Sequence, residues 1–303
     1  MTYLGRYRLD HVLGSGAFAT VWRGYDTELD AQVAVKVLAD NWAVNADVRE
    51  RFLTEARLLR KIESRRVVRV YDVGVASLGE AGSEGTGISR PYFVMDYIEG
   101  GTLQDLIGRI DAATAIYLAA EAAYAVQVLH ESGVLHRDVK PTNLLVDRTG
   151  EHPRVLAADL GSAKMLADAS GITVTAGSPA YMAPEQAANI GGFDARADVY
   201  ALGVVTFELL TGRRPFETVR TPRSRVPETG VPGKQAGDVD ALIARALEFD
   251  PDRRPRSAGA YADELRLLFQ GERLHRHDVP AAWVIAGATL AGVGAGALAW
   301  WLR

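Results

Sequence analysis

The hydrophobic pattern of the chain divides it into a strand-rich front and a helix-rich back. In residues 7–38, runs rich in Val, Phe, Tyr and Trp are separated by glycines, which predicts three antiparallel strands. Residues 46–62 instead carry apolar side chains at a helical repeat among charges. Two further strands are expected over 66–75 and 91–98, and the Gly/Ser-rich residues 76–89 are expected only to connect them.

Helical patterns dominate after residues 95–101, which form the join between the two parts. The expected helices cover 112–133, 197–212, 238–250 and 257–270. The first should end at Gly133, and the second is apolar enough to be buried. Residues 219–235 are rich in Pro, Gly and Arg without any period, so they predict a surface loop. The order of elements therefore predicts an α+β protein.

Composition narrows the possible functions only slightly. The chain has 303 residues, of which 24% are charged and 48% hydrophobic, and these values are typical of globular proteins. Its net charge of −4 gives no reason to expect a nucleic-acid partner. The absence of cysteine excludes disulfides, metal–thiolate sites and thiol catalysis. The N-terminus does not have the pattern of a signal peptide.

Glycines between two expected strands indicate a candidate phosphate-binding loop over Leu13–Val21. Gly14 and Gly16 lack the side chains that would keep backbone N–H groups away from phosphate oxygens. Ala19 stands where the G-x-G-x-x-G pattern has its last glycine. Glycines in a hairpin also serve simply as turn residues, so this loop alone does not decide the function.

A lysine on an expected strand is a second candidate. The alternation of side chains places Lys36 on the face opposite Val35 and Val37, and Ala34 leaves space beside it. Glu55, in the following helix, is the candidate ion-pair partner of Lys36. A lysine exposed to solvent on the strand is the alternative.

The stretch from Val134 to Val146 carries the strongest chemical signal. It combines a carboxylate, Asp138, with a cation, Lys140, and an amide oxygen, Asn143, in one loop. Phosphoryl transfer requires positioning and charge stabilisation, and these groups could orient a hydroxyl, contact the transferred phosphoryl and hold magnesium. A second carboxylate, Asp159, precedes a glycine after a short expected strand, and carboxylate oxygens suit Mg²⁺.

In order and spacing, these motifs resemble the eukaryotic-type Ser/Thr protein kinase family, with a bacterial character, over Tyr7 to Phe269. The resemblance implies a two-lobed α+β kinase fold. Residues 1–97 would form a small lobe with a five-stranded sheet and one helix, and residues 98–270 a helical large lobe. Arg254 would pair with Glu185 of the "APE" motif.

The resemblance also implies a role for each matched residue, with ATP, Mg²⁺ and protein Ser/Thr substrates as partners. Lys36, fixed by Glu55, would hold the α and β phosphates of ATP. Asp138 would orient the substrate hydroxyl, and Lys140 would steady the γ-phosphate. Asn143 and Asp159 would bind Mg²⁺. The ATP contacts would include Leu13, Gly14, Ser15, Gly16, Ala17, Phe18, Ala19, Thr20 and Val21, with Met95 behind the adenine and the Asp96 and Ile98 backbones hydrogen-bonding it.

Two departures from the family pattern affect packing and orientation and leave the charges in place. Leu160 replaces the phenylalanine after Asp159, and Ser178 replaces the usual threonine. Active transfer is therefore expected; a pseudokinase scaffold and a small-molecule kinase are the alternatives. The segment "GSPAYMAPE" argues against the small-molecule kinase.

The segment from Asp159 to Glu185 corresponds to the activation segment of the family. The resemblance implies that Arg137 pairs with a phosphate on this segment. Thr173 and Thr175 are the candidate acceptors. The expectation is therefore an enzyme activated by its own phosphorylation; threonines are also common in loops without such a role.

The end of the chain predicts a membrane anchor, with residues 271–280 as a linker. Residues 281–302 are uncharged, and as a helix they would rise about 33 Å, enough to cross a bilayer core. Tryptophans at both ends and arginines before the segment predict a single pass with the kinase domain in the cytoplasm. Small residues at four-residue spacing also allow a homodimer. The flanking residues are Trp283, Trp300, Trp301, Arg273 and Arg276.

Overall fold

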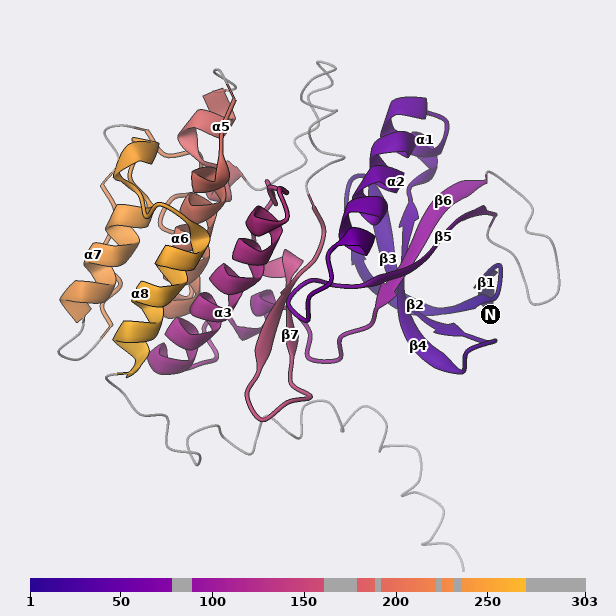
Figure 1. Cartoon of the computed structure of the whole chain (residues 1–303), viewed down its shortest axis with the longest axis horizontal. Coiled ribbons are helices and arrows are strands. Elements are labelled where there is room, and N and C mark those ends of the chain that lie inside the picture. Colours follow the sequence, from indigo (N-terminus) through magenta and orange to yellow (C-terminus); the bar gives the residue numbers. More distant parts are fainter. Residues whose placement is uncertain (78–88, 161–178, 189–191, 222–224, 232–235, 271–303) are drawn as a thin grey trace, which may run out of the picture.

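The computed structural model describes residues 1–77, 89–160, 179–188, 192–221, 225–231 and 236–270, which form two lobes (Figure 1). The small lobe is built on one antiparallel sheet with strand order β1-β2-β3-β4-β6-β5. Alternating side chains of its strands pack on two sides of the sheet. The strands are β1 (Thr2–Leu4), β2 (Tyr7–Ser15), β3 (Ala19–Asp26), β4 (Ala31–Leu38), β5 (Val70–Ala76) and β6 (Arg90–Asp96).

Two helices follow β4, namely α1 (Asp40–Ala43) and α2 (Ala46–Lys61). The side chain of Asn45 caps α2 by accepting the backbone N–H of Val48 at 3.0 Å. The apolar face of α2 packs against β5 and β6, as its helical repeat predicts. One carboxylate, that of Glu55, is buried on this face of α2 together with the apolar side chains.

The expected small lobe of five strands and one helix is wrong in its count. A sixth strand, β1, pairs with the start of β2 across a turn in which Gly5 has a φ of +59°. The helix α1 is also additional, and it has only four residues. Both elements are too short for a hydrophobic period to be recognised in the sequence. The strand β1 is defined by its hydrogen bonds to β2, which pair its backbone groups, and a local sequence pattern does not reveal such pairing.

The large lobe is mainly helical, with a two-stranded sheet on the side that faces the small lobe (Figure 1). Each of the four expected helices is present, although the first ends at Glu131, two residues before Gly133. The described elements of the large lobe are η1 (Leu103–Leu106), α3 (Ala112–Glu131), η2 (Pro141–Asn143), β7 (Leu144–Asp147), β8 (Arg154–Ala157), η3 (Pro179–Tyr181), α5 (Pro184–Ala188), α6 (Ala195–Thr211), α7 (Ala236–Ala246), η4 (Pro251–Arg253) and α8 (Ala258–Gln270).

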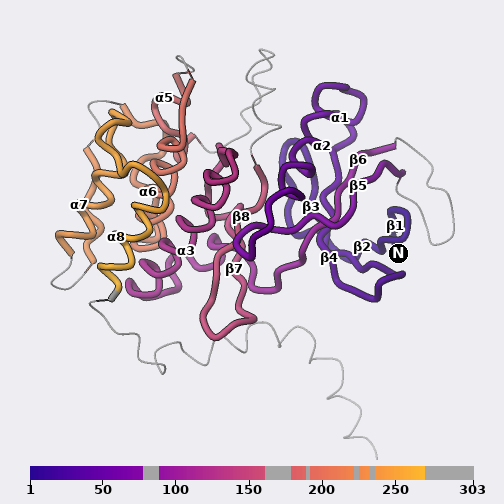
Figure 2. The backbone as a smooth tube through the Cα atoms, viewed as in Figure 1, coloured from indigo at the N-terminus to yellow at the C-terminus, as the bar shows by residue number. Residues whose placement is uncertain are grey.

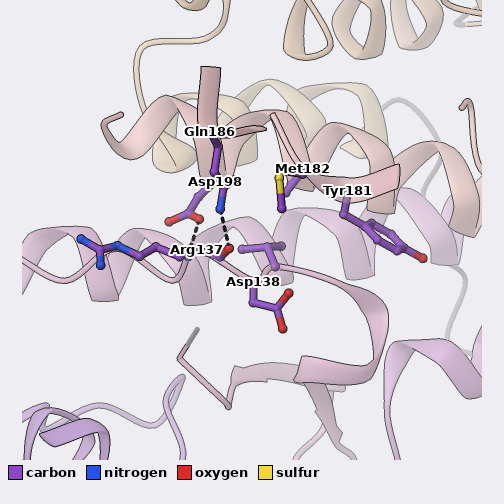
Figure 3. Close-up of a pocket in the computed structure, with 8 residues that line it drawn as sticks. Arg137, Asp138, Tyr181, Met182, Gln186 and Asp198 are labelled. Atoms are coloured by element: carbon purple, nitrogen blue, oxygen red, sulfur yellow. Dashed lines mark hydrogen bonds between the residues drawn. The ribbon is translucent and has the colours of Figure 1, made fainter. Parts of the chain in front are cut away.

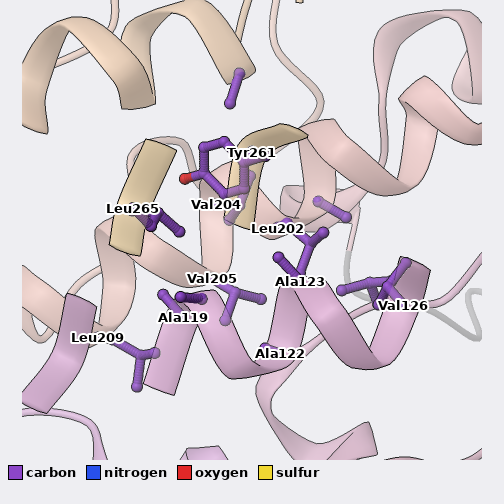
Figure 4. Close-up of a cluster of buried hydrophobic side chains, with 14 of the residues drawn as sticks. Ala119, Ala122, Ala123, Val126, Leu202, Val204, Val205, Leu209, Tyr261 and Leu265 are labelled. Carbon is purple, nitrogen blue, oxygen red and sulfur yellow. The ribbon is translucent and has the colours of Figure 1, made fainter. Parts of the chain in front are cut away.

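The core of the large lobe lies where α3 packs against α6 and α8 (Figure 4). Alanines line the buried face of α3, so neighbouring helices approach closely while larger side chains from α6 and α8 fill the remaining space. A polar contact also lies within this core, where the hydroxyl of Tyr261 donates to Thr206 Oγ1 at 2.9 Å. A closely packed core therefore supports the loops of the large lobe.

Two backbone segments among the described residues connect the lobes (Figure 2). The loop between α2 and β5 lies beside β8, where the backbones of Arg66 and Val68 exchange hydrogen bonds with Ala157 at 2.9 and 3.1 Å. The chain after β6 passes through Gly100, where a Cβ atom would stand 1.8 Å from the carbonyl oxygen of Val146. Only glycine permits this close approach.

Among the described residues, α3 is the single helix long and apolar enough to span a membrane by length and composition. Its alanine-rich face is buried in the core of the large lobe, which explains its hydropathy. The expected membrane-spanning residues 281–302, the linker 271–280 and most of the 76–89 connection lie outside the described residues.

Candidate active site

Two polar side chains of the loop after α3 converge on the carboxylate of Asp138. The ammonium of Lys140 donates to Asp138 Oδ2 at 2.7 Å, and the amide of Asn143 donates to the same oxygen at 3.1 Å. A second bond from Asn143 reaches the backbone carbonyl of Asp138 at 2.9 Å. Pro141 begins the short η2 helix, which holds Asn143 close behind the other two. The spacing of this stretch therefore brings together the base, the cation and the amide that it predicts.

A buried aspartate on α6 supports the backbone of this loop (Figure 3). Asp198 accepts the backbone N–H groups of His136 and Arg137, each at 2.8 Å, and it also contacts His130 Nε2 at 2.8 Å. Gln186 donates to the carbonyl of Arg137 at 2.9 Å. Arg137 has a φ of +68°, which is costly for a residue with a side chain. These bonds stabilise that backbone conformation and fix the direction of Asp138.

Lys36 lies between two carboxylates at the boundary of the lobes. Its ammonium is 2.7 Å from Glu55 Oε1 on α2 and also contacts Asp159 after β8. Val35 and Val37 pack on the opposite face of the sheet, while Ala34 shares the face of Lys36, as the alternation predicts. The predicted ion pair between β4 and α2 is present.

The charges around Lys36 determine how these groups titrate. Burial alone would lower the pKa of Lys36, but the neighbouring Asp159 and Glu55 carboxylates raise it above its ordinary value, so the ammonium stays charged. Burial raises the pKa of Glu55 to about 7, against the attraction of Lys36, which lowers it. The ion pair is therefore complete only above neutral pH.

The loop between β2 and β3 has glycines that its own structure does not require. A Cβ atom on Gly14 would meet nothing within 4 Å, and one on Gly16 would come no closer than 3.7 Å, to the Ala19 carbonyl. Neither glycine has a positive φ. Because neither conformation nor packing demands glycine, the open space beside the backbone suits a ligand that approaches closely, such as a phosphate chain.

The end of β6 supplies backbone groups for a planar ligand. The side chain of Asp96 is occupied with Tyr71 in β5 and with the backbone N–H of Arg69, just before β5, at 2.8 Å. Among the described residues, no acceptor pairs with the backbone N–H of Ile98. Met95 is buried behind this position. The arrangement fits the expected adenine contacts.

The oxygen groups expected to bind magnesium lie on adjoining backbone segments. The backbone N–H of Ala158 donates to the carbonyl of Asn143 at 3.0 Å, which brings Asn143 beside Asp159. Asp159 has a φ of +59°, and its carboxylate is partly exposed. An amide oxygen with a carboxylate is a donor set that suits Mg²⁺ when phosphates complete its coordination. The described residues contain no larger acidic or histidine cluster that could hold a metal by itself.

The predicted pair between Arg254 and Glu185 is also present. The two guanidinium nitrogens of Arg254 contact the two carboxylate oxygens of Glu185 at 2.6 and 2.8 Å. Glu185 is the second residue of α5, and the residue after it, Gln186, supports the loop that carries Asp138. The pair therefore holds α5 in place, and α5 in turn supports the loop that carries Asp138.

Comparison with known proteins agrees with this geometry. The family model described as "Protein kinase domain" matches residues 7–264. The chain belongs to the protein kinase family. Among solved structures, the Mycobacterium tuberculosis PknI kinase domain has a TM-score of 0.66 and 25% identity, with 88% of this chain and 96% of that chain covered. This family uses ATP and Mg²⁺.

Curated relatives are bacterial serine/threonine kinases. Streptomyces coelicolor Serine/threonine-protein kinase PksC is 35% identical over 96% of this chain and 53% of its own length. Mycobacterium leprae Serine/threonine-protein kinase PknB is 34% identical over 88% of this chain and 43% of its own length. The chain thus spans about half the length of these two relatives.

Two functional features were not anticipated from the sequence. Asp198 accepts hydrogen bonds from the backbone of the loop that carries Asp138. The sequence feature that could have indicated this role is a single carboxylate in the first turn of an apolar helix. Trp42 contacts the glycine-rich loop from α1, a helix too short to be predicted. The regulatory candidates Thr173 and Thr175, together with Ser178, lie outside the described residues.

Proposed function

We propose that this chain is an active serine/threonine protein kinase that transfers the γ-phosphate of ATP to Ser and Thr hydroxyls of proteins. One observation carries the proposal: the Lys36–Glu55 pair and the Asp138–Lys140–Asn143 cluster are both assembled in the same structure. A scaffold that had lost catalysis would not need to retain every one of these charges. Lys140, two residues after Asp138, is the pattern of Ser/Thr kinases.

Each residue then has a chemical task in the transfer. Asp138 orients the substrate hydroxyl and accepts its proton as the oxygen–phosphorus bond forms and the bond to the ADP oxygen breaks. Lys140 stabilises the negative charge on the moving phosphoryl group, and Lys36 holds the phosphates that stay behind. Asn143 and Asp159 would hold Mg²⁺, which supplies charge neutralisation on the phosphates when it is bound.

Replacing Asp138 with asparagine tests this assignment. The chain is incubated with Mg-ATP and a generic protein substrate, and intact mass detects added phosphate on either protein. Asp138→Asn should abolish transfer while leaving ATP binding in place, because Lys36 and the glycine-rich loop are untouched. Asp47→Asn, which changes an exposed carboxylate on α2, is the matched control and should transfer as the unchanged chain does. Comparable turnover by Asp138→Asn would refute the assignment.

Self-phosphorylation of the activation segment is part of the proposal. A phosphate on Thr173 or Thr175 would bring about −1.5 to −2 charges and pair with an arginine beside the catalytic aspartate, for which Arg137 is the candidate. Phosphopeptide mapping of active protein tests it. Active enzyme with neither threonine phosphorylated would contradict this switch.

We further propose that residues 281–302 anchor the kinase in the cell membrane as a single pass, with the catalytic domain in the cytoplasm. The uncharged length, the terminal tryptophans and the arginines before the segment support it. The full chain should resist alkaline carbonate extraction, and a chain ending at residue 270 should not. Pairing of two anchors through Gly292 would form a homodimer. Gly292→Leu with unchanged self-association would exclude that pairing face.

A further inference from the structure

The tip of the glycine-rich loop is attached to α1 by contacts that involve one tryptophan. The indole N–H of Trp42 donates to the carbonyl of Ala17 at 2.9 Å. Its ring lies against the ring of Phe18, with centroids 5.0 Å apart and planes tilted by 33°. The backbone N–H of Ala39, just before α1, donates to the carbonyl of Phe18 at 2.8 Å. Two consecutive carbonyls and one side chain of the loop tip are thereby held on the same support.

The support is itself fixed to the rest of the small lobe. Asp40, the first residue of α1, accepts a hydrogen bond at 2.8 Å from Arg90, at the start of β6. At the other end of α1, the Arg49 side chain from α2 donates to the carbonyl of Ala43 at 3.1 Å. The short helix is therefore connected to both the sheet and α2, and a loop resting on it shares their position.

The other polar side of the loop tip is left available. Among the described residues, no acceptor pairs with the backbone N–H groups of Ala17 and Phe18, although the carbonyls of both residues are bonded. The nearby Gly14 has open space where a side chain would stand. A backbone with its carbonyls held and its N–H groups available is suited to binding an anion.

We propose that Trp42 is a positioning residue that holds the phosphate-binding loop in place for ATP. The inference rests on the proposed kinase function, since it concerns how the same site binds its nucleotide. A free loop loses conformational entropy when it closes on a ligand, and a loop already held on a support loses less. Trp42 therefore raises the affinity for the phosphate chain without touching it.

The test compares two variants of Trp42 with the unchanged full chain. Titration calorimetry with a magnesium complex of a non-hydrolysable ATP analogue should give a Kd about tenfold higher for Trp42→Ala, which removes both the ring contact and the N–H donor. Trp42→Phe keeps an aromatic ring and should recover part of the affinity, to about threefold above the unchanged chain. Val44→Ala, at an exposed position directly after α1, is the matched control and should bind as the unchanged chain does.

Kinetics and hydrogen exchange separate positioning from a loss of fold. In transfer assays, Trp42→Ala should raise KM for ATP while leaving kcat within about twofold, because the groups that contact the reacting atoms are unchanged. Amide exchange should quicken in the peptide covering residues 13–21 and stay unchanged in the peptides of α3 and α6. A Trp42→Phe variant that binds as weakly as Trp42→Ala, with both of them slowed in kcat, would indicate a general structural role and overturn the proposal.

Binding and transfer also distinguish this inference from the proposed function. Unchanged chain that binds the analogue but transfers no phosphate would refute the kinase activity, and the calorimetry of Trp42→Ala would still decide the role of the tryptophan. Folded Trp42→Ala with an affinity equal to, or higher than, that of the unchanged chain would overturn the inference even if transfer is normal. Higher affinity would mean that α1 holds the loop away from the nucleotide.

Discussion

Replacing Arg254 with methionine should destabilise the protein far more than breaking an equally short ion pair at the surface. The side chain of Arg254 is fully buried, and each of its five N–H donors has an acceptor. Two of these bonds reach the carboxylate of Glu185, and its ring contact is Tyr200, 5.0 Å from the guanidinium carbon. The other three reach backbone carbonyls at 2.8, 3.0 and 3.2 Å, those of Glu248, Arg196 and Phe249.

The size of the loss follows from what methionine leaves behind. Methionine fills much of the same space but donates no hydrogen bond, so one carboxylate and three carbonyls lose a donor whose side chain is fully buried. Removing one partner of a buried pair typically costs about 3–5 kcal/mol. The pair between Arg57 and Glu50 has the same kind of contact at 2.7 Å, but its side chains are 58% and 65% exposed. An exposed pair of this kind contributes about 0–1 kcal/mol.

Urea unfolding followed by circular dichroism measures the difference. Arg254→Met should lose about 3 kcal/mol or more in the free energy of unfolding, and its Tm should fall by about 10 °C. Arg254→Lys has three donors for five acceptors and should fall between Arg254→Met and the unchanged chain. The surface control, Arg57→Met, should change stability by less than about 1 kcal/mol. If the two methionine variants lose equal stability, burial of the guanidinium does not determine its contribution, and the reasoning fails.

Three further predictions concern the active site. Acidification from pH 8 to 6 should raise KM for ATP, because burial raises the pKa of Glu55 to about 7 and its protonation breaks the pair with Lys36; Glu55→Gln should remove this dependence. Glu55 also makes the stability depend on pH: because its pKa is raised in the folded protein, its contribution is fully present below pH 4.5 and is lost as the pH rises through 7. In urea titrations, the stability difference between Glu55→Gln and the unchanged chain should therefore shift in favour of Glu55→Gln as the pH rises from 5 to 8. Leu160→Ala should cost about 2–5 kcal/mol in the same assay, because Leu160 is buried in the core beside the sheet and α2. Gly14→Ala should keep the Tm within about 2 °C yet weaken ATP binding, whereas Gly100→Ala should lower the Tm by several degrees, because its Cβ would overlap a backbone carbonyl.

The parts of the site that could be predicted from the sequence are those set by local geometry. Strand alternation placed Lys36 opposite two valines, and the helical repeat placed Glu55 on the buried face of the next helix. The spacing within one loop was enough to bring Asp138 and Asn143 together, since a single short turn separates them. In each case the relevant neighbours lie within one element or its immediate connection, where periodicity and turn chemistry constrain the backbone strongly.

The supports of the site depend on contacts that no local pattern specifies. Trp42 and Ala17 are 25 positions apart, and their hydrogen bond exists only because a hairpin and a one-turn helix meet above the sheet. Asp198 lies more than 60 positions along the chain from His136 and Arg137, whose backbone N–H groups donate hydrogen bonds to it. A carboxylate at the start of an apolar helix does carry information, because burying its charge is unfavourable unless several donors surround it. The sequence could therefore indicate that donors must reach Asp198, but the packing of α3 against α6 decides which loop supplies them. That packing makes the position of Asp138 a property of the whole large lobe, so core substitutions far from the nucleotide should also change catalysis.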